Sequence, residues 1–411
     1  MRSMARARQR PHVLISASRD ERSFVNTLKE ATAMGKMPER RLNILGTRGI
    51  PAAHGGFESF VARYAPYMKN NGWMVTVYCQ GAEGQKRVSK RRDVWNGIER
   101  VHIDTYSRGA LATVEFDLRS VIDVVRRPGV DLVLGYNTAV FNLIEKLLGR
   151  TVVMNMDGIE WKRSKWGRLA KTWFWLNEWI GSRLCDVPVA DHPQIAAHLA
   201  SRGCERAVVI PYGSDSIKDS PSSALAAINV ETDRFFVTIA RIEPENSILE
   251  IIRAFLGAVV DAKLLVLGKF EPNTNTYHAT IAKAIKGSTS VVFPGGIYDP
   301  EVLAAIRTHC LGYVHGHQVG GTNPSLVEAL GAGTPVIAHD NRFNRWTAGE
   351  GQLFFTDEAE CAAAMRELAT SPERRASASA DSRKRHAEDF TFEKIHRAYE
   401  DLIERAASRR S

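Results

Sequence analysis

One block of the sequence constrains the fold more than any other. Residues 315–338 read HGHQVGGTNPSLVEALGAGTPVIA, which predicts a short strand, a glycine-rich turn, a helix, a glycine stop and a second apolar strand. Asn323 stands where an N-cap belongs, and Pro324 where the first helical residue belongs. Because the first turn of a helix has free N–H groups and a positive dipole end, this turn is a predicted anion site, and phosphate is the usual anion.

A carboxylate near that turn indicates which phosphate compound binds. Glu328 follows one turn into the predicted helix, so its oxygens can accept hydrogen bonds from sugar hydroxyls beside the phosphates. Phosphate and ribose together indicate a nucleotide. The alternative is a strand–turn–helix unit that binds no ligand. The candidate binding residues of this block are Gly320, Gly321, Thr322, Asn323 and Glu328.

Length and composition limit the classes of protein. A chain of 411 residues with 44% hydrophobic residues is long enough for two soluble domains. Its five cysteines are an odd number without a CxxC pair, which argues against a disulfide framework and favours a reducing cytoplasm. No apolar run approaches the ~20 residues that span a bilayer. The net charge of +9 allows a phosphorylated substrate, an anionic membrane or nucleic acid, but no nucleic-acid-binding motif is present, so we expect no nucleic-acid partner.

Strands and helices alternate along the chain from residue 41 onward, which predicts parallel sheets with helices on both faces. A Ser-, Pro- and Asp-rich segment, residues 212–231, is the best candidate linker between two such halves. We therefore expect an α/β protein with two Rossmann-like, doubly wound domains facing each other across a cleft, and a C-terminal helix that closes the chain. The expected divisions are a weakly structured extension (1–40), an N-terminal domain (41–215), a C-terminal domain (216–390), and the closing helix with a basic tail (391–411). The expected strands are 42–46, 74–79, 100–104, 132–135, 151–156, 235–240, 263–267, 290–293 and 312–315, and the expected helices are 57–71, 114–126, 247–260, 277–285, 300–308, 359–370 and 392–406.

A second glycine-rich loop, residues 46–58, joins the first predicted strand to the first predicted helix, where doubly wound sheets bind phosphates. Its spacing is not GxGxxG, and the second strand ends at Gln80 with no acidic residue for a ribose, so a NAD or FAD site is not favoured. Gly55 and Gly56 let the backbone approach a diphosphate without a Cβ. His54 is a loop histidine of undetermined role, and helix N-terminal capping explains Glu58.

The block at residues 315–338 resembles the donor-binding signature of retaining, metal-independent glycosyltransferases of family four, which have the GT-B architecture of two facing Rossmann-like domains. Two glutamates lie eight residues apart in that signature. Glu328 matches the second, which implies that it holds the nucleotide ribose, whereas Gly320 stands at the first. In the segment ARIEPEN, Arg241 matches an arginine that neutralises the diphosphate, and Asn246 replaces the family's lysine. Lys269 is either a substitute cation or a plain surface lysine.

The loop sequence GTRGIPAAHGGFESF is similar to a bacterial subgroup identified as rhamnosyltransferases of surface polysaccharide assembly. The resemblance implies that Gly55 and Gly56 contact the donor diphosphate from an acceptor-side N-terminal domain, and that the C-terminal domain binds the donor. It implies dTDP-rhamnose as the favoured donor, with UDP- and GDP-hexoses open, and neither cofactor nor metal. Asp157, in a subgroup-like Asp-Gly-Ile-Glu-Trp pattern after a buried strand, should face the cleft and hold a sugar or acceptor hydroxyl, or else cap the strand-end turn.

A tryptophan-rich segment follows Asp157. Indole rings favour the headgroup level of a bilayer and basic residues favour anionic lipid, so this segment is a candidate helix on the inner membrane face, near a polyprenyl-linked acceptor. The alternatives are aromatic packing between helices and an aromatic sugar platform. The tryptophans are Trp161, Trp166, Trp173, Trp175 and Trp179, with Lys162, Arg163, Lys165, Arg168 and Lys171 among them.

These features predict a hexosyltransferase that moves rhamnose or another hexose from a nucleotide sugar to a glycan acceptor, with Asp157 and Arg241 as catalytic candidates. The expected location is the cytoplasm, peripheral to the inner face of the cell membrane. Because Gly320 and Asn246 depart from the signature, a catalytically inactive nucleotide-sugar-binding scaffold stays open, as does hydrolysis or epimerisation of a nucleotide sugar.

Overall fold

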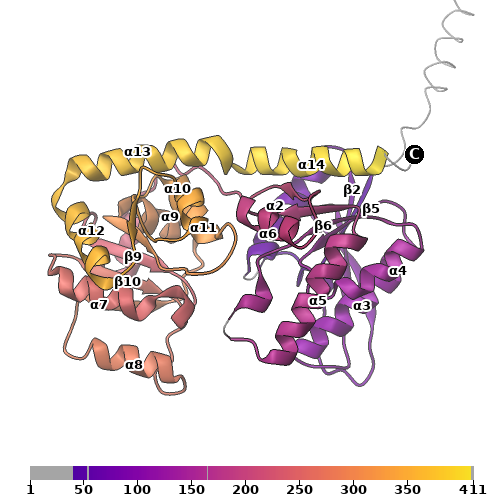
Figure 1. Cartoon of the computed structure of the whole chain (residues 1–411), viewed down its shortest axis with the longest axis horizontal. Helices are drawn as coiled ribbons and strands as arrows, with labels where there is room; N and C mark the ends of the chain where they lie inside the picture. Colours follow the sequence, from indigo (N-terminus) through magenta and orange to yellow (C-terminus); the bar gives the residue numbers. More distant parts are fainter. Residues whose placement is uncertain (1–39, 53–54, 164, 409–411) are drawn as a thin grey trace, which may run out of the picture. The chain divides into compact units, whose positions relative to one another are not determined.

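The computed structural model describes residues 40–52, 55–163 and 165–408 (Figure 1). The chain divides into two units, residues 1–40 and Arg41–Ser411, and the helices and strands of the described residues lie in the second. The expected weak structure of the N-terminal extension, the role of His54 and the end of the basic tail lie outside the described residues.

The N-terminal half of this unit is built on a sheet whose described strands have the order β3-β4-β2-β1-β5-β6-β7-β8. All neighbours are parallel except β3 and β4, which pair in antiparallel fashion. The strand order reverses between β1 and β5, so the loops that leave these two strands diverge and open a crevice. The strands are β1 (Arg41–Leu45), β2 (Met74–Gln80), β3 (Lys90–Trp95), β4 (Ile98–Ile103), β5 (Val130–Leu134), β6 (Thr151–Asn155), β7 (Val187–Ala190) and β8 (Val208–Val209).

Helices cover both faces of this sheet because alternate strand residues point to opposite sides. Ile44 of β1 packs in one core with Phe60 of α2, whereas the next residue, Leu45, packs in another core with Phe116 of α3. The helices are α2 (Gly56–Asn70), α3 (Ala110–Val124), α4 (Asn142–Leu147), α5 (Arg168–Leu184) and α6 (Pro193–Ser201), with short 3-10 turns η1 (Ala139–Phe141) and η2 (Glu160–Lys162).

The C-terminal half repeats the design with described strands in the order β11-β10-β9-β12-β13-β14, all parallel. Phe236 of β9 packs with α7 and α12 on one face, and Phe235 packs with α9 and α10 on the other. The strands are β9 (Phe235–Ile239), β10 (Lys263–Leu267), β11 (Val291–Gly295), β12 (Gly312–His315), β13 (Val336–His339) and β14 (Leu353–Phe355). The helices are η3 (Ser222–Ile228), η4 (Pro244–Asn246), α7 (Ile248–Ala258), α8 (Thr276–Ala284), α9 (Pro300–His309), α10 (Pro324–Ala332), α11 (Arg342–Ala348) and α12 (Glu358–Thr370). The prediction of two doubly wound domains is confirmed.

Two long helices end the chain, α13 (Pro372–Asp389) and α14 (Phe392–Ser408), drawn in yellow in Figure 1. Helix α13 packs on α10, but α14 returns to the first sheet, where Tyr399 and Ile403 join the core of β1 and α2. The Tyr399 hydroxyl accepts a 2.8 Å hydrogen bond from the Asn155 side chain at the end of β6. The predicted closing helix therefore belongs to the N-terminal core.

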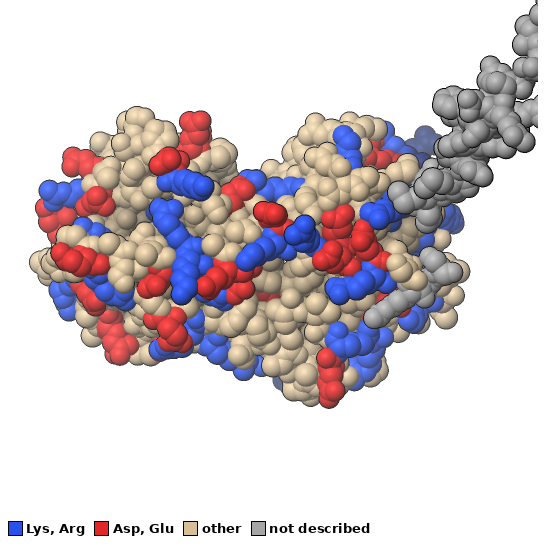
Figure 2. All heavy atoms as spheres, turned by 90° about the horizontal axis from the view of Figure 1, so that it is seen from above, with Lys and Arg blue, Asp and Glu red and all other residues tan. Residues whose placement is uncertain are grey.

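The face that carries α13 and α14 shows basic and acidic side chains interspersed (Figure 2). Ion pairs of α13 include Arg374 with Glu367 of α12, and Arg385 with Asp389. This mixture disperses the positive charge of the chain, so this face does not present the basic stripe that tracks a phosphate backbone.

An antiparallel hairpin begins between the expected strands 74–79 and 100–104, where no strand was predicted. Its first strand, β3, begins at Lys90 and pairs with β4. Asn96 and Gly97 join the two strands with φ angles of 49° and 77°, the left-handed pair that a tight hairpin turn needs. The prediction was wrong because β3 is polar and lies at the sheet edge, where no apolar alternation marks a strand.

The segment between the halves is also more ordered than the predicted linker, residues 212–231. Its second part forms η3, and Leu225 is 2% exposed in the core beside α9. Helix α13 was also not predicted, although Ser371 caps it by accepting a hydrogen bond from the Arg374 amide and Pro372 begins it. Further elements that were not predicted are α4, β7, α6, β8, α11 and β14.

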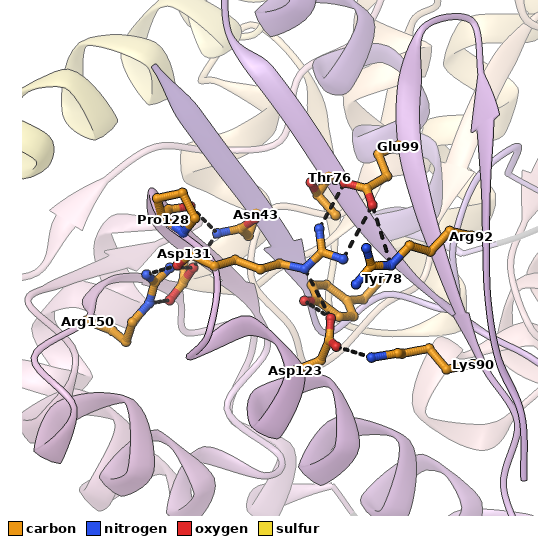
Figure 3. Close-up of polar contacts among 11 residues, drawn as sticks. Asn43, Thr76, Tyr78, Lys90, Arg92, Glu99, Asp123, Pro128, Asp131 and Arg150 are labelled. Atoms are coloured by element: carbon orange, nitrogen blue, oxygen red, sulfur yellow. Dashed lines mark hydrogen bonds and ion pairs between the residues drawn. The ribbon is translucent and has the colours of Figure 1, made fainter. Parts of the chain in front are cut away.

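Charged side chains form a network within the N-terminal sheet (Figure 3). Asp131 of β5 is fully buried, and its carboxylate accepts hydrogen bonds from Arg150 at 2.7 Å and from Asn43 at 2.9 Å. Nearby, Arg127 joins Glu99 and Asp123, the latter also accepting from the Tyr78 hydroxyl. A buried charge that loses its partner costs far more than the pair contributes, so these residues constrain one another.

We predict that Asp131→Ala lowers the free energy of unfolding by about 3–5 kcal/mol, because it leaves the Arg150 guanidinium buried without its counter-charge. Urea unfolding measures the loss. The matched control is Asp261→Ala, which removes an ion pair with Arg234 whose side chains are 95% and 55% exposed, and which should cost at most about 1 kcal/mol. Equal losses in the two variants would contradict the prediction.

Candidate active site

A cavity of about 490 Å³ is lined by residues from both halves of the chain. Its N-terminal wall comes from the start of α2 and from the residues that follow β6 and β7, including Asp157 and Asp191. Its C-terminal wall comes from residues that follow β9 and β12, including Arg241 and the turn 319–323. Since β9 and β12 flank the point where the second strand order reverses, this wall stands where open α/β sheets bind ligands.

The glycine-rich turn before α10 has the predicted geometry. The Asn323 side chain accepts a 3.0 Å hydrogen bond from the Ser325 amide, and Pro324 is the first helical residue. Gly320, Gly321, Thr322 and Asn323 all line the cavity. The positive end of α10 is therefore directed at the cavity, as an anion site requires.

Asp191, which the sequence analysis missed, meets this turn from the opposite wall. Its carboxylate accepts a 3.1 Å hydrogen bond from the Thr322 amide, and its backbone carbonyl accepts one from the Thr322 hydroxyl. A Cβ on Gly321 would lie 2.2 Å from the Asp191 Oδ2 atom, so this approach requires glycine. The strand β7 followed by Asp-His-Pro, a strand end leading into a capped helix, is the sequence signal that marks the residue.

Asp157 lies beside Asp191 at the cavity wall. It adopts a left-handed φ of 48°, and its amide donates a 2.8 Å hydrogen bond to the Asn155 side chain. Burial, reinforced by Glu160, raises the pKa of Asp157 to about 6. Burial and the Asp157 charge raise the pKa of Asp191 to about 8. Two neighbouring carboxyl groups with separated pKa values can hold a proton and release it at neutral pH.

Four cations line the cavity: Arg241, Arg163, Lys162 and Arg342. Only Arg241 was predicted. Its side chain is 57% exposed and lies 3.4 Å from Glu243. Arg163 donates hydrogen bonds to Glu160 and, across the two halves, to Glu245.

Other predicted residues lie outside the cavity wall. Asn246 is 3% exposed and donates a 2.8 Å hydrogen bond to the Arg241 carbonyl, so it shapes the loop and carries no charge to the site. Lys269 is 80% exposed and pairs with Glu271 at 2.9 Å, as a surface lysine does. The Glu328 carboxylate pairs with Arg307.

The two candidate glycines of the loop at residues 46–58 lie in different positions. Gly56 lines the cavity near Pro324, whereas Gly55 precedes it with a φ of 107° at the N-cap of α2. Glu58 lies in the first turn of α2, and its carboxylate accepts hydrogen bonds from the Arg48 amide at 2.9 Å and the Thr47 hydroxyl at 3.3 Å. It thereby fixes the start of the loop.

His317 is a further cavity residue that the sequence analysis missed. Its ring stacks on His315 with centroids 4.3 Å apart, and its Nδ1 atom is buried without a hydrogen-bond partner among the described residues. Burial, helped by Arg241 and Arg163, lowers the pKa of His317 to about 4, so the ring is neutral at pH 7.

Each half of the chain matches a known protein-family model. Residues 39–215 match a domain of unknown function, DUF1972, and residues 225–385 match the family described as glycosyl transferases group 1. This chain carries a group 1 glycosyltransferase domain. The glycine-rich turn before α10, Arg241 and Glu328 all lie within it. No curated protein matches the sequence.

Solved structures show that the glycosyltransferase domain is part of a GT-B fold. The chain is similar to sucrose-phosphate synthase from Thermosynechococcus elongatus, with a TM-score of 0.76, 17% identity, and coverage of 90% of this chain and 100% of that one. Anabaena HepE in complex with UDP and glucose gives a TM-score of 0.69 at 15% identity, covering 89% and 99% of the two chains. A trehalose-phosphate synthase from Burkholderia xenovorans in complex with glucose-6-phosphate gives 0.68 at 13% identity, covering 89% and 100%.

The five tryptophans of the tryptophan-rich segment lie in the N-terminal half and divide into two groups. Trp161 and Trp166 donate hydrogen bonds to Glu178 and Glu160, and so pack inward. The other three lie on α5 and stay 38–48% exposed: Trp173, Trp175 and Trp179. No helix among the described residues is long and apolar enough to cross a bilayer, and all five cysteines are buried and unpaired.

We predict that Gly321→Ala lowers the free energy of unfolding by about 1–3 kcal/mol, because the added methyl displaces Asp191 from the Thr322 amide. Urea unfolding measures the loss. The control is Gly257→Ala in α7, where a Cβ meets open space and should be neutral or stabilising by up to about 1 kcal/mol. A Gly321→Ala variant as stable as the wild type would show that this contact is not formed in solution.

Proposed function

We propose that this protein transfers a hexose from a nucleotide-sugar donor to a glycan acceptor, with retention of configuration and without a metal ion. The observation that carries the proposal is the cavity at the N-terminus of α10, lined also by Arg241, in a group 1 glycosyltransferase domain. dTDP-rhamnose is the favoured donor because the loop 46–58 resembles a rhamnosyltransferase subgroup, and UDP- and GDP-hexoses are the other candidates.

The donor diphosphate occupies the turn at Gly321 and Thr322, where backbone amides and the helix dipole favour negative charge. Arg241 stabilises the charge that develops on the departing nucleoside diphosphate. The family's second cation is absent at Asn246, and Arg163 and Arg342 at the cavity wall offset its loss. Glu328 exchanges its contact with Arg307 for the ribose hydroxyls.

A retaining transfer needs no protein nucleophile when the acceptor attacks on the face that the leaving group vacates. The donor phosphate then receives the acceptor proton. Asp157 orients the acceptor or sugar hydroxyl from the opposite wall, and its raised pKa of about 6 leaves it largely ionised at pH 7.

The acceptor binds in the N-terminal domain, where a second cavity of about 220 Å³ lies at the ends of β1 and β5. Asp117 lines it and accepts a 2.8 Å hydrogen bond from the Thr138 hydroxyl. Asn137 also lines it, and its carbonyl accepts a 2.7 Å hydrogen bond from Trp173 on α5. This cavity thus adjoins Trp173, one of the exposed tryptophans.

Exposed leucines in the N-terminal half support a membrane-bound, polyprenyl-linked acceptor at the inner face of the cell membrane. They lie on or next to α3, α4 and α5, of which α4 contacts the other two. Arg168 and Arg183 of α5 are exposed as well, as binding to anionic lipid requires. The leucines are Leu111, Leu143, Leu147, Leu148, Leu169 and Leu176, between 41% and 76% exposed except Leu169, which is 89% exposed.

A nucleotide-sugar-binding scaffold without turnover is the second candidate function. It is favoured by Gly320, which stands in place of the signature's first glutamate, and by the structural role of Asn246. Both functions require the donor to bind, and only the first requires transfer to an acceptor.

We predict that one class of nucleotide sugar stabilises the protein without added metal. A ligand at 100 times its Kd contributes about 2.7 kcal/mol to the free energy of unfolding, which a thermal-shift panel of dTDP-, UDP-, GDP- and ADP-sugars detects.

Arg241→Ala should lower turnover about 10²–10³-fold, the effect of removing one charge-stabilising donor. Lys269→Ala, which removes an exposed lysine outside the cavity, should leave turnover unchanged. A donor that binds but is never transferred would select the scaffold, and no binding would reject both functions.

We predict that the double variant Leu169→Asp, Leu176→Asp lowers partitioning onto phosphatidylserine vesicles at least tenfold. Insertion of one leucine contributes ~1.5–3 kcal/mol, and about 1.4 kcal/mol is a factor of ten. Co-sedimentation measures the bound fraction. Val259→Asp is the control, because Val259 is 88% exposed on the C-terminal half and should not contact lipid. Unchanged sedimentation of the double variant would reject the membrane-bound acceptor.

A further inference from the structure

Asp191 has a position that binding of a nucleotide sugar does not by itself explain. It extends from the end of β7 and accepts the Thr322 amide hydrogen at 3.1 Å, in the turn that begins α10. The Thr322 hydroxyl donates to the Asp191 backbone carbonyl, so the two residues are held together twice. The second carboxylate oxygen, Oδ1, is buried and has no hydrogen-bond partner among the described residues.

The Asp191 carboxylate therefore accepts the Thr322 amide hydrogen, which an anion bound at the helix N-terminus would also need. One N–H group donates one strong hydrogen bond, so Asp191 and a donor phosphate cannot both accept the Thr322 hydrogen fully. Two anions at hydrogen-bond distance from one amide also repel each other. The same carboxylate lies where any Cβ on Gly321 would fall, at 2.2 Å, so it fills the space above the turn.

The surroundings of Asp191 make its protonation state sensitive to a second anion. Burial and the neighbouring Asp157 raise the pKa of Asp191 to about 8. A diphosphate beside it adds negative charge and raises that pKa further. Two neighbouring cavity residues have pKa values below 8. Burial lowers the pKa of His317 to about 4, and burial raises the pKa of Asp157 only to about 6. The remaining charged or titratable groups among the described residues around the cavity are Glu160, Lys162, Arg163, Tyr212, Arg241, Arg342 and Tyr399.

We propose that Asp191 is a proton-linked positioning residue of the donor site: its ionised carboxylate holds the Thr322 amide when the site is empty, and only the protonated acid yields that amide to the donor diphosphate, so that binding to the ionised form takes up one proton from solvent. The neutral acid then has an O–H group that donates to a phosphate or sugar oxygen of the donor. This inference rests on the proposed donor site, and it assigns to the second wall of the cavity a group that acts on the diphosphate.

The sign of the pH dependence follows from linkage. Binding favours the protonated form of Asp191, so affinity is full below the pKa of the empty protein and falls as pH rises through about 8. The loss approaches tenfold per pH unit above that value. UDP and dTDP are suitable probes, because a phosphate with a pKa near 6 stays ionised throughout the range from pH 7 to 9.

The test is isothermal titration calorimetry of the full chain with UDP and with dTDP at pH 7 and pH 9. For the wild type we expect Kd to rise about tenfold between these pH values. Titration at pH 9 in two buffers of different ionisation enthalpy should show uptake of close to one proton per nucleotide. This second measurement needs no variant, so it holds even where a substitution at Asp191 impairs folding.

The variant Asp191→Asn removes the charge and keeps an acceptor for the Thr322 amide. Its Kd should change less than about twofold between pH 7 and 9, and it should bind more tightly than the wild type at pH 9. Asp186→Asn is the matched control, because the Asp186 carboxylate also accepts from a backbone amide, that of Val152 at 2.9 Å, but lies outside the cavity. It should keep the wild-type pH dependence.

The outcomes separate the inference from the function beneath it. Nucleotide binding with the same pH dependence in the wild type and in Asp191→Asn, or without proton uptake at pH 9, would overturn the role of Asp191 and leave the donor site intact. Failure of UDP, dTDP, GDP and ADP to bind the wild type at pH 7 would instead remove the donor site itself.

Discussion

Parallel pairing of strands is the constraint on which the rest of this structure depends. A parallel pair needs a crossover that returns the chain to the same edge of the sheet, so each pair brings a helix and covers a sheet face. It also brings the carboxyl ends of all strands to one edge. Asp157, Asp191, Arg241 and the turn before α10 each follow a strand directly, and together they line one cavity.

The cavity is lined by side chains of both charges. Cations and a helix N-terminus line it, while two neighbouring acids with raised pKa values stand at the N-terminal wall. In the empty protein these opposite charges partly satisfy one another, as Asp191 does with the Thr322 amide. These contacts hold the cavity wall together without a ligand, and the proposed diphosphate would replace the one at the Thr322 amide.

Local rules predicted those parts of the fold whose signals lie within a few residues of one another. The capped turn at Asn323, the alternating strands and the amphipathic α14 were all readable in this way. The polar edge strand β3 was not, because its pairing with β4 is decided by the Asn96–Gly97 turn and not by apolar alternation. Helix α13 was missed for a related reason: only Ala378, Ser382 and His386 are buried along it.

The sequence by itself determined the fold class, the geometry of the candidate phosphate-binding turn and the candidate role of Arg241, because each depends on a short run of residues with a known local conformation. Only the tertiary structure decided which side chains meet. Thr322 contacts Asp191 across 131 residues of chain, Glu328 pairs with Arg307, and Asn246 turns inward to the Arg241 carbonyl. These contacts arise from the packing of distant elements, which no local pattern encodes.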